Sequence, residues 1–105
     1  MSERKGVLLL MFDVPMGNKV EKSNYRKLKK QLKILGYIAL QESVYVKLLK
    51  NTSNTKNEIK KLKDNIVASG SVLVLPMSLE NFKQIQSVTG AMFDLSLFSD
   101  DTIYV

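Results

Sequence analysis

The chain of 105 residues contains no cysteine and no histidine. The lack of cysteine excludes a disulfide framework and thiolate metal sites, and the lack of histidine excludes zinc chemistry and histidine-based acid–base catalysis. A bound metal ion would be a hard cation such as Mg²⁺, held by carboxylate and carbonyl oxygens. No apolar segment approaches the roughly 20 residues of a membrane-spanning helix, and the first residues lack a signal-peptide pattern. We expect a cytoplasmic protein without a membrane partner.

Basic and acidic residues are distributed unevenly along the chain, whose net charge is +6. Residues 1–63 contain 15 of the 16 basic residues and have a net charge of +10, whereas residues 64–105 have a net charge of −4. A strongly basic segment favours a polyanionic partner such as nucleic acid. The alternative is that the lysines only keep a small protein soluble, and charge alone does not decide between the two.

An unbroken apolar run over residues 7–12 ends at Asp13 and is followed by Val14 and Pro15. A run that is apolar on successive residues predicts a strand buried on both faces. Asp13 would then stand at the carboxyl end of the strand, where open sheets often place ligand-binding groups. An aspartate in this position is also typical of a turn, in which its carboxylate accepts hydrogen bonds from nearby backbone amides.

Hydrophobic spacing predicts six regular elements. A strand at about 7–13 is followed by a helix at 20–35, strands at about 37–41 and 43–49, a helix with its apolar stripe at 59, 62 and 66, and a strand at 72–75. This order predicts an α+β, ferredoxin-like fold, a four-stranded antiparallel sheet with both helices on one face. Because the first and last strands are apolar on both faces, we predict that a second copy covers the other face in a sheet-to-sheet homodimer.

The chain is expected to consist of two parts. Residues 1–77 form the predicted ferredoxin-like core. Residues 78–105 form a carboxyl-terminal extension, in which we predict a short helix over 78–88 and a short strand over 102–105. We expect this extension to add to the edge of a sheet, that of the partner copy.

Basic residues recur at three- and four-residue intervals on both predicted helices, which places them along one face of each. The acids that could offset them are few, Glu21 on the first helix and Glu58 on the second. Like charges at this spacing repel, and phosphate groups would relieve the repulsion, so we predict contact with a nucleic-acid backbone. The candidate nucleic-acid-binding residues are Lys22, Arg26, Lys29, Lys30, Lys33, Lys56, Lys60 and Lys63.

The run Phe12-Asp13-Val14-Pro15, the basic helix after it and the stretch Ser43-Val44-Tyr45-Val46-Lys47-Leu48-Leu49 occur in this order in one short chain. Together they resemble the smaller of the two universal CRISPR adaptation proteins, above all members from type II systems. The resemblance spans nearly the whole chain. It implies a ferredoxin-like homodimer in which Asp13 binds Mg²⁺ at the dimer interface and is the catalytic residue if the chain cuts nucleic acid. It also implies that residues 103–105 join the sheet of the partner.

The same resemblance implies a function in spacer acquisition. In this family the dimer bridges two dimers of the larger adaptation protein, the integrase, and forms the platform along which double-stranded DNA lies. The alternative is a metal-dependent endonuclease that acts on its own on RNA or duplex DNA. A third hypothesis is an unrelated ferredoxin-like binding module.

Three further residues match a motif of the same family, Gln41, Ser43 and Tyr45. A serine at a strand bend and a half-buried tyrosine are usually structural, and we interpret these residues as structural. Ala39 stands where several members that are reported as nucleases have a basic residue.

Overall fold

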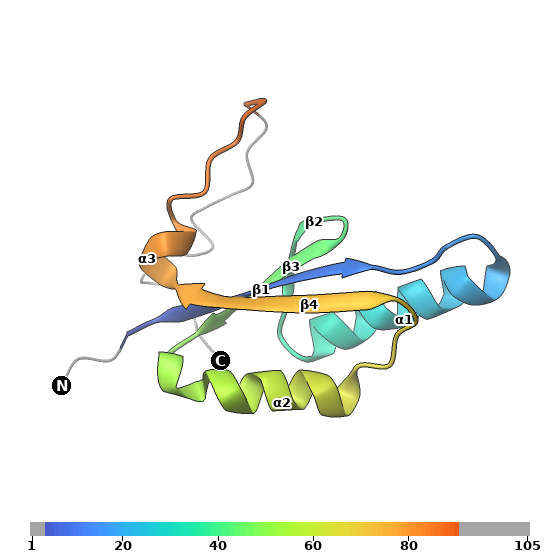
Figure 1. The fold of residues 1–105 in the computed structure, drawn as a ribbon, viewed down its shortest axis with the longest axis horizontal. Coiled ribbons are helices and arrows are strands. Elements are labelled where there is room, and N and C mark those ends of the chain that lie inside the picture. The colour runs from blue at the N-terminus through green and yellow to red at the C-terminus, as the bar shows by residue number, and fades with distance from the viewer. Residues whose placement is uncertain (1–3, 91–105) are drawn as a thin grey trace.

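A four-stranded antiparallel sheet forms the centre of the structure, a computed structural model that describes residues 4–90 (Figure 1). Its strands are β1 (Gly6–Asp13), β2 (Ile38–Gln41), β3 (Val44–Leu49) and β4 (Ser71–Ser78). They lie in the spatial order β2-β3-β1-β4, so β1 is central and pairs antiparallel with both β3 and β4. The four strands predicted between residues 7 and 75 are therefore confirmed, with bounds that differ by a few residues.

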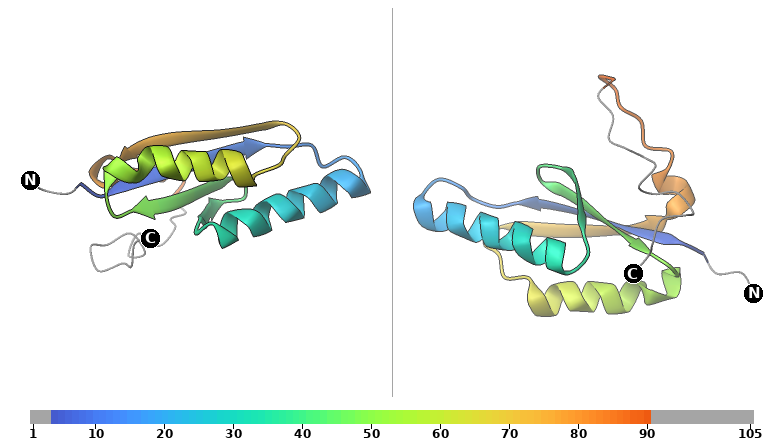
Figure 2. Two further views of the ribbon diagram at one scale, coloured as in Figure 1. Left: turned by 90° about the horizontal axis from the view of Figure 1, so that it is seen from below. Right: turned by 180° about the vertical axis from the view of Figure 1, so that it is seen from behind.

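Both long helices lie on the same face of this sheet (Figure 2). α1 (Lys19–Ile34) begins after the capping residue Asn18 and ends before Gly36, whose φ of 96° favours glycine. α2 (Thr55–Asn65) follows a short 3-10 helix, η1 (Thr52–Asn54). The strand order and the two crossover helices confirm the α+β, ferredoxin-like fold.

The main core lies between the sheet and these two helices. Alternate residues of β1 point toward the helices, because successive side chains of a strand point to opposite faces. They pack against the apolar stripes that the sequence predicts on α1 and α2. The buried residues of this core are Leu8, Leu10, Phe12, Tyr25, Leu28, Leu32, Tyr37, Tyr45, Leu49 and Leu62.

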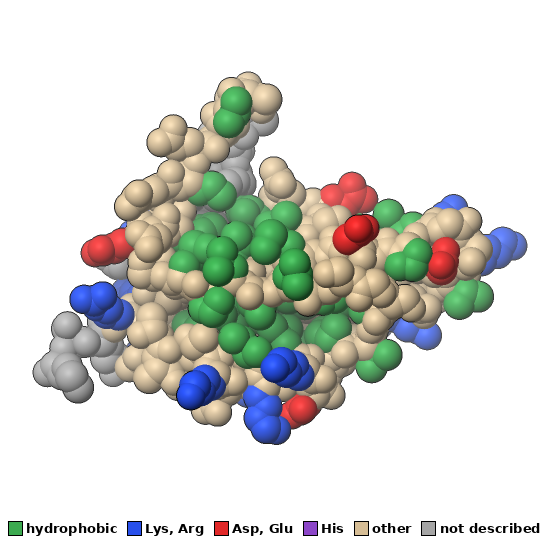
Figure 3. Space-filling model, viewed as in Figure 1, with side chains coloured by type: hydrophobic (Ala, Val, Ile, Leu, Met, Phe, Trp, Pro, Cys, Tyr) green, Lys and Arg blue, Asp and Glu red, His purple; other side chains and the backbone are tan. Residues whose placement is uncertain are grey.

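The other face of the sheet, which we call the open face, carries a second and smaller apolar cluster. A short helix after β4, α3 (Leu79–Phe82), packs Leu79 and Phe82 against Val7, Val46 and Leu48. Hydrophobic side chains gather on both sides of β4, toward α3 and toward α2 (Figure 3). α3 covers only part of the open face, since three apolar side chains on the strands stay 60%, 50% and 40% exposed, those of Leu73, Leu75 and Ile38.

The segment after α2 differs from the prediction in two ways. β4 does not end before Pro76 but continues to Ser78, which is compatible with proline because β4 is an edge strand with an unpaired side. α3 has four residues and is shorter than the helix predicted over 78–88. The strand predicted over 102–105 lies outside the described residues. Within residues 4–90, no helix is long and apolar enough to cross a membrane.

Candidate functional site

Asp13 is the last residue of β1 and lies at one end of the open face. Its side chain is on the same side as that of Met11, and in the sheet register Asp13 stands opposite Ser71 while Met11 stands opposite Leu73. The residue is exposed, and within residues 4–90 its carboxylate forms no hydrogen bond or ion pair. The described part of the chain therefore does not use this carboxylate in a turn, the alternative that the sequence leaves open.

A metal ion at Asp13 would need oxygen donors beyond this one carboxylate. Among the described residues, no three or more Asp, Glu, His or Cys side chains are grouped so that they could hold a metal ion. An exposed carboxylate is a suitable ligand for Mg²⁺, which commonly takes one or two carboxylates and keeps several water molecules. The donor chemistry of Asp13 therefore fits Mg²⁺.

The basic residues predicted on α1 lie together on one side of this helix. At 3.6 residues per turn they fall within an arc of about 100°, on the side of α1 that faces the turn between β2 and β3. Two contacts show this orientation: Lys29 Nζ lies 4.4 Å from the ring centroid of Tyr25, and the Tyr25 hydroxyl lies 3.4 Å from Oε1 of Glu42 in that turn. We call these residues the basic flank of α1: Lys22, Arg26, Lys29, Lys30 and Lys33.

The basic flank of α1 has no acidic partner within the described residues. Four of its five side chains are exposed, and Lys29 is half-buried over the ring of Tyr25. Burial and, after it, the charge of Glu42 raise the pKa of the Tyr25 hydroxyl, which keeps it protonated as the hydrogen-bond donor to this glutamate. The flank is therefore a row of positive charges that is open to solvent.

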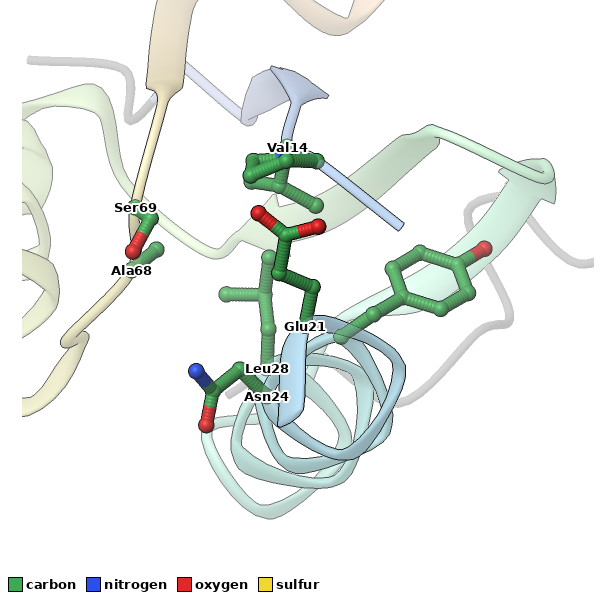
Figure 4. A pocket seen from close by; sticks show the side chains of 8 residues that line it. Val14, Glu21, Asn24, Leu28, Ala68 and Ser69 are labelled. Atoms are coloured by element: carbon green, nitrogen blue, oxygen red, sulfur yellow. The ribbon is translucent and has the colours of Figure 1, made fainter. Parts of the chain in front are cut away.

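Glu21, the acid on α1 that could offset these charges, is used at the start of the helix. Its backbone amide donates to Oδ1 of Asn18 at 2.9 Å, and its Oε1 accepts from the amide of Gly17 at 2.9 Å. Figure 4 shows its carboxylate pointing from α1 toward Val14, in a small pocket that Ala68 borders on the other side. The carboxylate of Glu21 is thus directed toward the sheet and away from the basic flank.

The opposite side of α1 carries a different set of polar residues. Asn24, Lys27 and Gln31 line a groove between α1 and the loop from α2 to β4, which contributes residues 67–69. Lys27 is exposed and follows Arg26 in the sequence, yet it lies about 100° around the helix from it. These two neighbours therefore present the same charge on different sides of α1.

The lysines predicted on α2 are exposed, and their spacing places them within an arc of about 60° around this helix. Lys63 lines a groove with Ile59 of α2 and Val74 of β4, and Figure 3 shows Lys and Arg side chains beside this groove. Lys60 is paired with Asp64, with Nζ 2.9 Å from Oδ2. The basic flank of α1 faces the β2–β3 turn, whereas Lys63, with Lys56 and Lys60 on the same arc of α2, lies beside the groove at β4. The two basic sets thus lie on opposite outer sides of the helical layer.

Comparison with known proteins places this chain in a family. Residues 7–85 match the family model described as CRISPR associated protein Cas2. The CRISPR-associated endoribonuclease Cas2 of Streptococcus mutans serotype c is 35% identical over 95 residues, which are 90% of this chain and 88% of that protein. The chain belongs to the Cas2 family.

Two other Cas2 proteins, both also named CRISPR-associated endoribonuclease Cas2, show how the similarity extends. The protein of Campylobacter jejuni is 34% identical over 81% of this chain and 59% of its own length. The protein of Treponema denticola is 28% identical over 93% of this chain and 97% of its own length. The resemblance stated from the sequence is confirmed, and the chain is a CRISPR-associated protein whose candidate site residues all lie within the matched segment.

The three residues that the sequence analysis matched to a family motif lie at the β2–β3 hairpin. Tyr45 is buried in the main core, with its ring centroid 5.9 Å from that of Phe12, and burial raises the pKa of its hydroxyl. The backbone carbonyl of Ser43 accepts a hydrogen bond from the amide of Phe12 at 3.1 Å. Gln41 is exposed at a register irregularity that follows Ala39. Within residues 4–90, Tyr45 and Ser43 make contacts that hold β1 and β3 together.

Sequence reasoning missed a buried ion pair in this Cas2 chain. Lys47 lies on the helix-facing side of β3, and its Nζ is 2.8 Å from Oε2 of Glu58 on α2. Glu58 is therefore turned into the core, where its Oε2 meets Lys47, and its Oε1 lies 3.4 Å from Nζ of the exposed Lys61. Within the described residues it forms no ion pair with Lys56, Lys60 or Lys63, the lysines beside which the sequence had placed it as an offsetting acid. The signal in the sequence is the strand alternation, since Lys47 falls between the inward positions Tyr45 and Leu49.

Proposed function

We propose that this chain acts in CRISPR spacer acquisition as a homodimeric scaffold that binds duplex DNA through its backbone and bridges dimers of the integrase. The basic flank of α1 is the observation that carries the proposal, because it presents five basic side chains without an acidic partner in residues 4–90. A row of charges on a rigid helix suits contacts with successive phosphates, which give affinity without reading the base sequence.

The open face supports the dimer. Leu73 and Leu75 of β4 are exposed next to the partly covered residues Leu9 and Met11, so a second copy that packs on this face would remove apolar surface from water. Asp13 lies on the same face and would then approach its equivalent in the partner. Two carboxylates close together repel each other, and a shared cation would neutralise that repulsion.

Asp13 also supports a second candidate function, that of a metal-dependent endonuclease. Its carboxylate is exposed and without a partner in the described residues, and the relatives are named endoribonucleases. Mg²⁺ held by Asp13 of both copies would supply an activated water molecule and shield the charge of the phosphodiester. The role of this chain's own residue would be to hold the cation at the two-fold axis.

Two adjacent substitutions test the scaffold. Arg26→Glu reverses a charge on the basic flank of α1, and Lys27→Glu makes the same change in charge on the other side of the same helix. We expect Arg26→Glu to weaken duplex DNA binding about tenfold and to reduce its salt dependence, and Lys27→Glu to have a much smaller effect. Equal effects of the two variants, or no effect of Arg26→Glu, would contradict binding along this flank.

A substitution at Asp13 separates the two functions. Asp13→Asn removes a charged ligand while it keeps the size of the side chain. The scaffold predicts that this variant still binds duplex DNA and still forms a complex with the integrase of the same locus when the two are coexpressed. The endonuclease predicts loss of Mg²⁺-dependent cleavage of single-stranded RNA or duplex DNA by the purified dimer. Loss of integration with intact DNA binding would show that the scaffold alone does not describe the function.

A further inference from the structure

A single buried ammonium group connects three elements of the fold. Lys47 lies in the middle of β3 opposite Leu8 of β1, and its side chain is 6% exposed. Its Nζ donates hydrogen bonds to the backbone carbonyl oxygen of Leu35 at 2.7 Å and to Oε2 of Glu58 at 2.8 Å. The ring centroid of Tyr37 lies 5.8 Å from the same Nζ, within the range of a cation–π contact.

Both hydrogen-bond partners belong to helix ends. Leu35 caps the carboxyl end of α1, where the last carbonyl groups lack donors within the helix and a cation is favoured. Glu58 lies in the first turn of α2, where a carboxylate is favoured by the exposed amide groups. Lys47 thus ties the end of α1 and the beginning of α2 to the centre of the sheet, and we call this arrangement the Lys47 brace.

The Lys47 brace lies between the two sets of basic residues. The basic flank of α1 and the lysines of α2 are on opposite outer sides of the helical layer, so the distance between them depends on how far apart the two helices lie. The phosphates on each strand of a duplex recur at about 3.4 Å of rise along the helix axis, so the separation of α1 and α2 determines how many are contacted at once.

We propose that Lys47 is a positioning residue that fixes the separation of α1 and α2 for nucleic-acid binding. The proposal rests on the function proposed above, because it concerns how the basic residues meet a duplex. Lys47 itself is buried, so its ammonium group is not part of the basic surface. It acts through the end of α1 and through Glu58.

The first experiment measures the separation of the helices directly. The chain has no cysteine, so Ile34→Cys in the last turn of α1 and Asn57→Cys in the first turn of α2 provide two unique exposed sites for spin labels. Labelled protein is diluted with unlabelled protein to suppress distances between copies. Lys47→Met Glu58→Leu removes the brace with apolar side chains of similar size, which cores generally accept. Lys60→Met Asp64→Leu removes an exposed ion pair of α2 and is the matched control for the distance measurement.

We expect a narrow distance distribution for the unsubstituted pair and for the control, and a shifted or clearly broader one for the brace variant. In salt titrations with a duplex, the logarithm of the binding constant decreases linearly with the logarithm of the salt concentration. This decrease should be less steep in the brace variant, with a slope smaller in magnitude by about 1 to 2, since fewer phosphates are contacted together. An unchanged distance distribution in a folded brace variant would overturn the positioning role. A changed distribution with an unchanged slope would overturn its link to nucleic acid.

Two further measurements keep these outcomes separate. If the brace variant does not fold, Glu58→Gln removes the charge of the carboxylate but keeps its shape, and the same distance measurement applies to it. If the unsubstituted chain shows no salt-dependent binding to duplex DNA, the proposed function itself fails, and the nucleic-acid role of Lys47 fails with it. A failure of the positioning role alone leaves the binding of the unsubstituted chain intact.

Discussion

The backbone of Gly70 packs directly against the backbone of Asp13. Gly70 has a φ of 98°, and a Cβ atom added to it would clash with the carbonyl oxygen of Asp13 and lie 3.1 Å from Cα of Val14. A glycine is therefore required here for two reasons, its backbone conformation and the space that it leaves. The end of β1, which carries the candidate metal ligand, is held in place by the residue that precedes β4.

Gly70→Ala is expected to destabilise the chain and to displace Asp13. Gly90 is the matched control, because its φ is 89° and an added Cβ would meet nothing within 4 Å. We expect Gly90→Ala to lower the free energy of unfolding by about 1–2 kcal/mol from backbone strain, and Gly70→Ala to lower it by about 3–4 kcal/mol. Urea denaturation of both variants measures the difference. Equal decreases in the free energy of unfolding would show that the backbone around Asp13 moves away from the added Cβ atom without further destabilisation.

The buried pair of Lys47 and Glu58 predicts a strongly non-additive effect on stability. Lys47→Met alone leaves a buried carboxylate without its main partner, and we expect it to lower the free energy of unfolding by about 3–5 kcal/mol. Adding Glu58→Leu should restore most of this loss, because a buried ion pair can be replaced by apolar side chains at little cost. Denaturant unfolding of both single variants and the double variant measures the coupling.

The exposed pair on the same helix provides the contrast. The side chains of Lys60 and Asp64 are 74% and 59% exposed, and Lys60→Met should change the free energy of unfolding by about 0.5 kcal/mol or less. A loss at Lys47 no larger than the loss at Lys60 would mean that water reaches the buried pair.

The pH dependence of the free energy of unfolding should also depend on the buried pair, through the protonation of Glu58. Burial by itself would raise the pKa of Glu58, but the hydrogen bond and charge of Lys47, with a smaller contribution from Lys61, outweigh burial and lower the pKa below 4.5. As the pH is lowered below about 4.5, Glu58 therefore takes up a proton in the unfolded chain before it does so in the folded chain. The free energy of unfolding decreases as the pH is lowered further, until the pH is below the pKa of Glu58 in the folded chain. Above about pH 5 this contribution is constant.

A comparison of two proteins isolates this contribution. The remaining carboxylates contribute equally to acid unfolding in the unsubstituted chain and in Lys47→Met Glu58→Leu. Thermal unfolding midpoints between pH 3 and pH 7 should fall more steeply toward acid in the unsubstituted chain. Parallel curves for the two proteins would show that the pKa of Glu58 is the same in the folded and unfolded states.

Most of the architecture could be predicted from the sequence because it depends on local periodicity. The apolar run before Asp13, the helical stripe that includes Leu28 and Leu32, and the glycine after α1 each have one simple structural interpretation. The order of the elements then determines the topology. The position of Asp13 at the end of the first strand follows from the same pattern.

The features that sequence reasoning missed depend on tertiary contacts. A lysine in a strand is normally expected at the surface. Lys47 can be buried because Glu58 and the end of α1 accept its hydrogen bonds, and these partners are 11 and 12 residues away in the sequence. The spacing of the basic residues shows that each set shares one side of its helix, but it does not show which neighbour that side faces. This is why the separation of the two basic sets was not predicted.

Tyr37 predicts a substitution that should not weaken the fold. Its hydroxyl is buried and has no hydrogen-bond partner among the described residues, and burial, with the charge of Glu58 as a smaller cause, raises its pKa. Leaving such a group unpaired costs about 1–3 kcal/mol. The free energy of unfolding of Tyr37→Phe should therefore be at least that of the unsubstituted chain, and up to about 1 kcal/mol higher. The ring stays in place over Lys47. A loss of more than about 1 kcal/mol in denaturant unfolding would show that the hydroxyl has a partner in solution.

The open face predicts how the chain associates. Leu73 is 60% exposed in the single chain, so Leu73→Glu should leave the fold of each copy intact, but in the proposed dimer it would bury a charge opposite an apolar surface. We expect the dimer to dissociate at concentrations at least tenfold higher than before, as measured by sedimentation velocity over a concentration series. Val88→Glu is the control, because Val88 is fully exposed and lies beyond the sheet.

Association and the metal site can be tested together because both depend on the open face. If two copies share a cation between their Asp13 side chains, Mg²⁺ should shift the equilibrium toward the dimer in the unsubstituted chain and should have little effect in Asp13→Asn. Leu73→Glu should then weaken the response to Mg²⁺ although Asp13 is unchanged, since it separates the two carboxylates. A dimer that persists in Leu73→Glu would place the interface elsewhere. It would also leave the two Asp13 carboxylates too far apart to hold one ion.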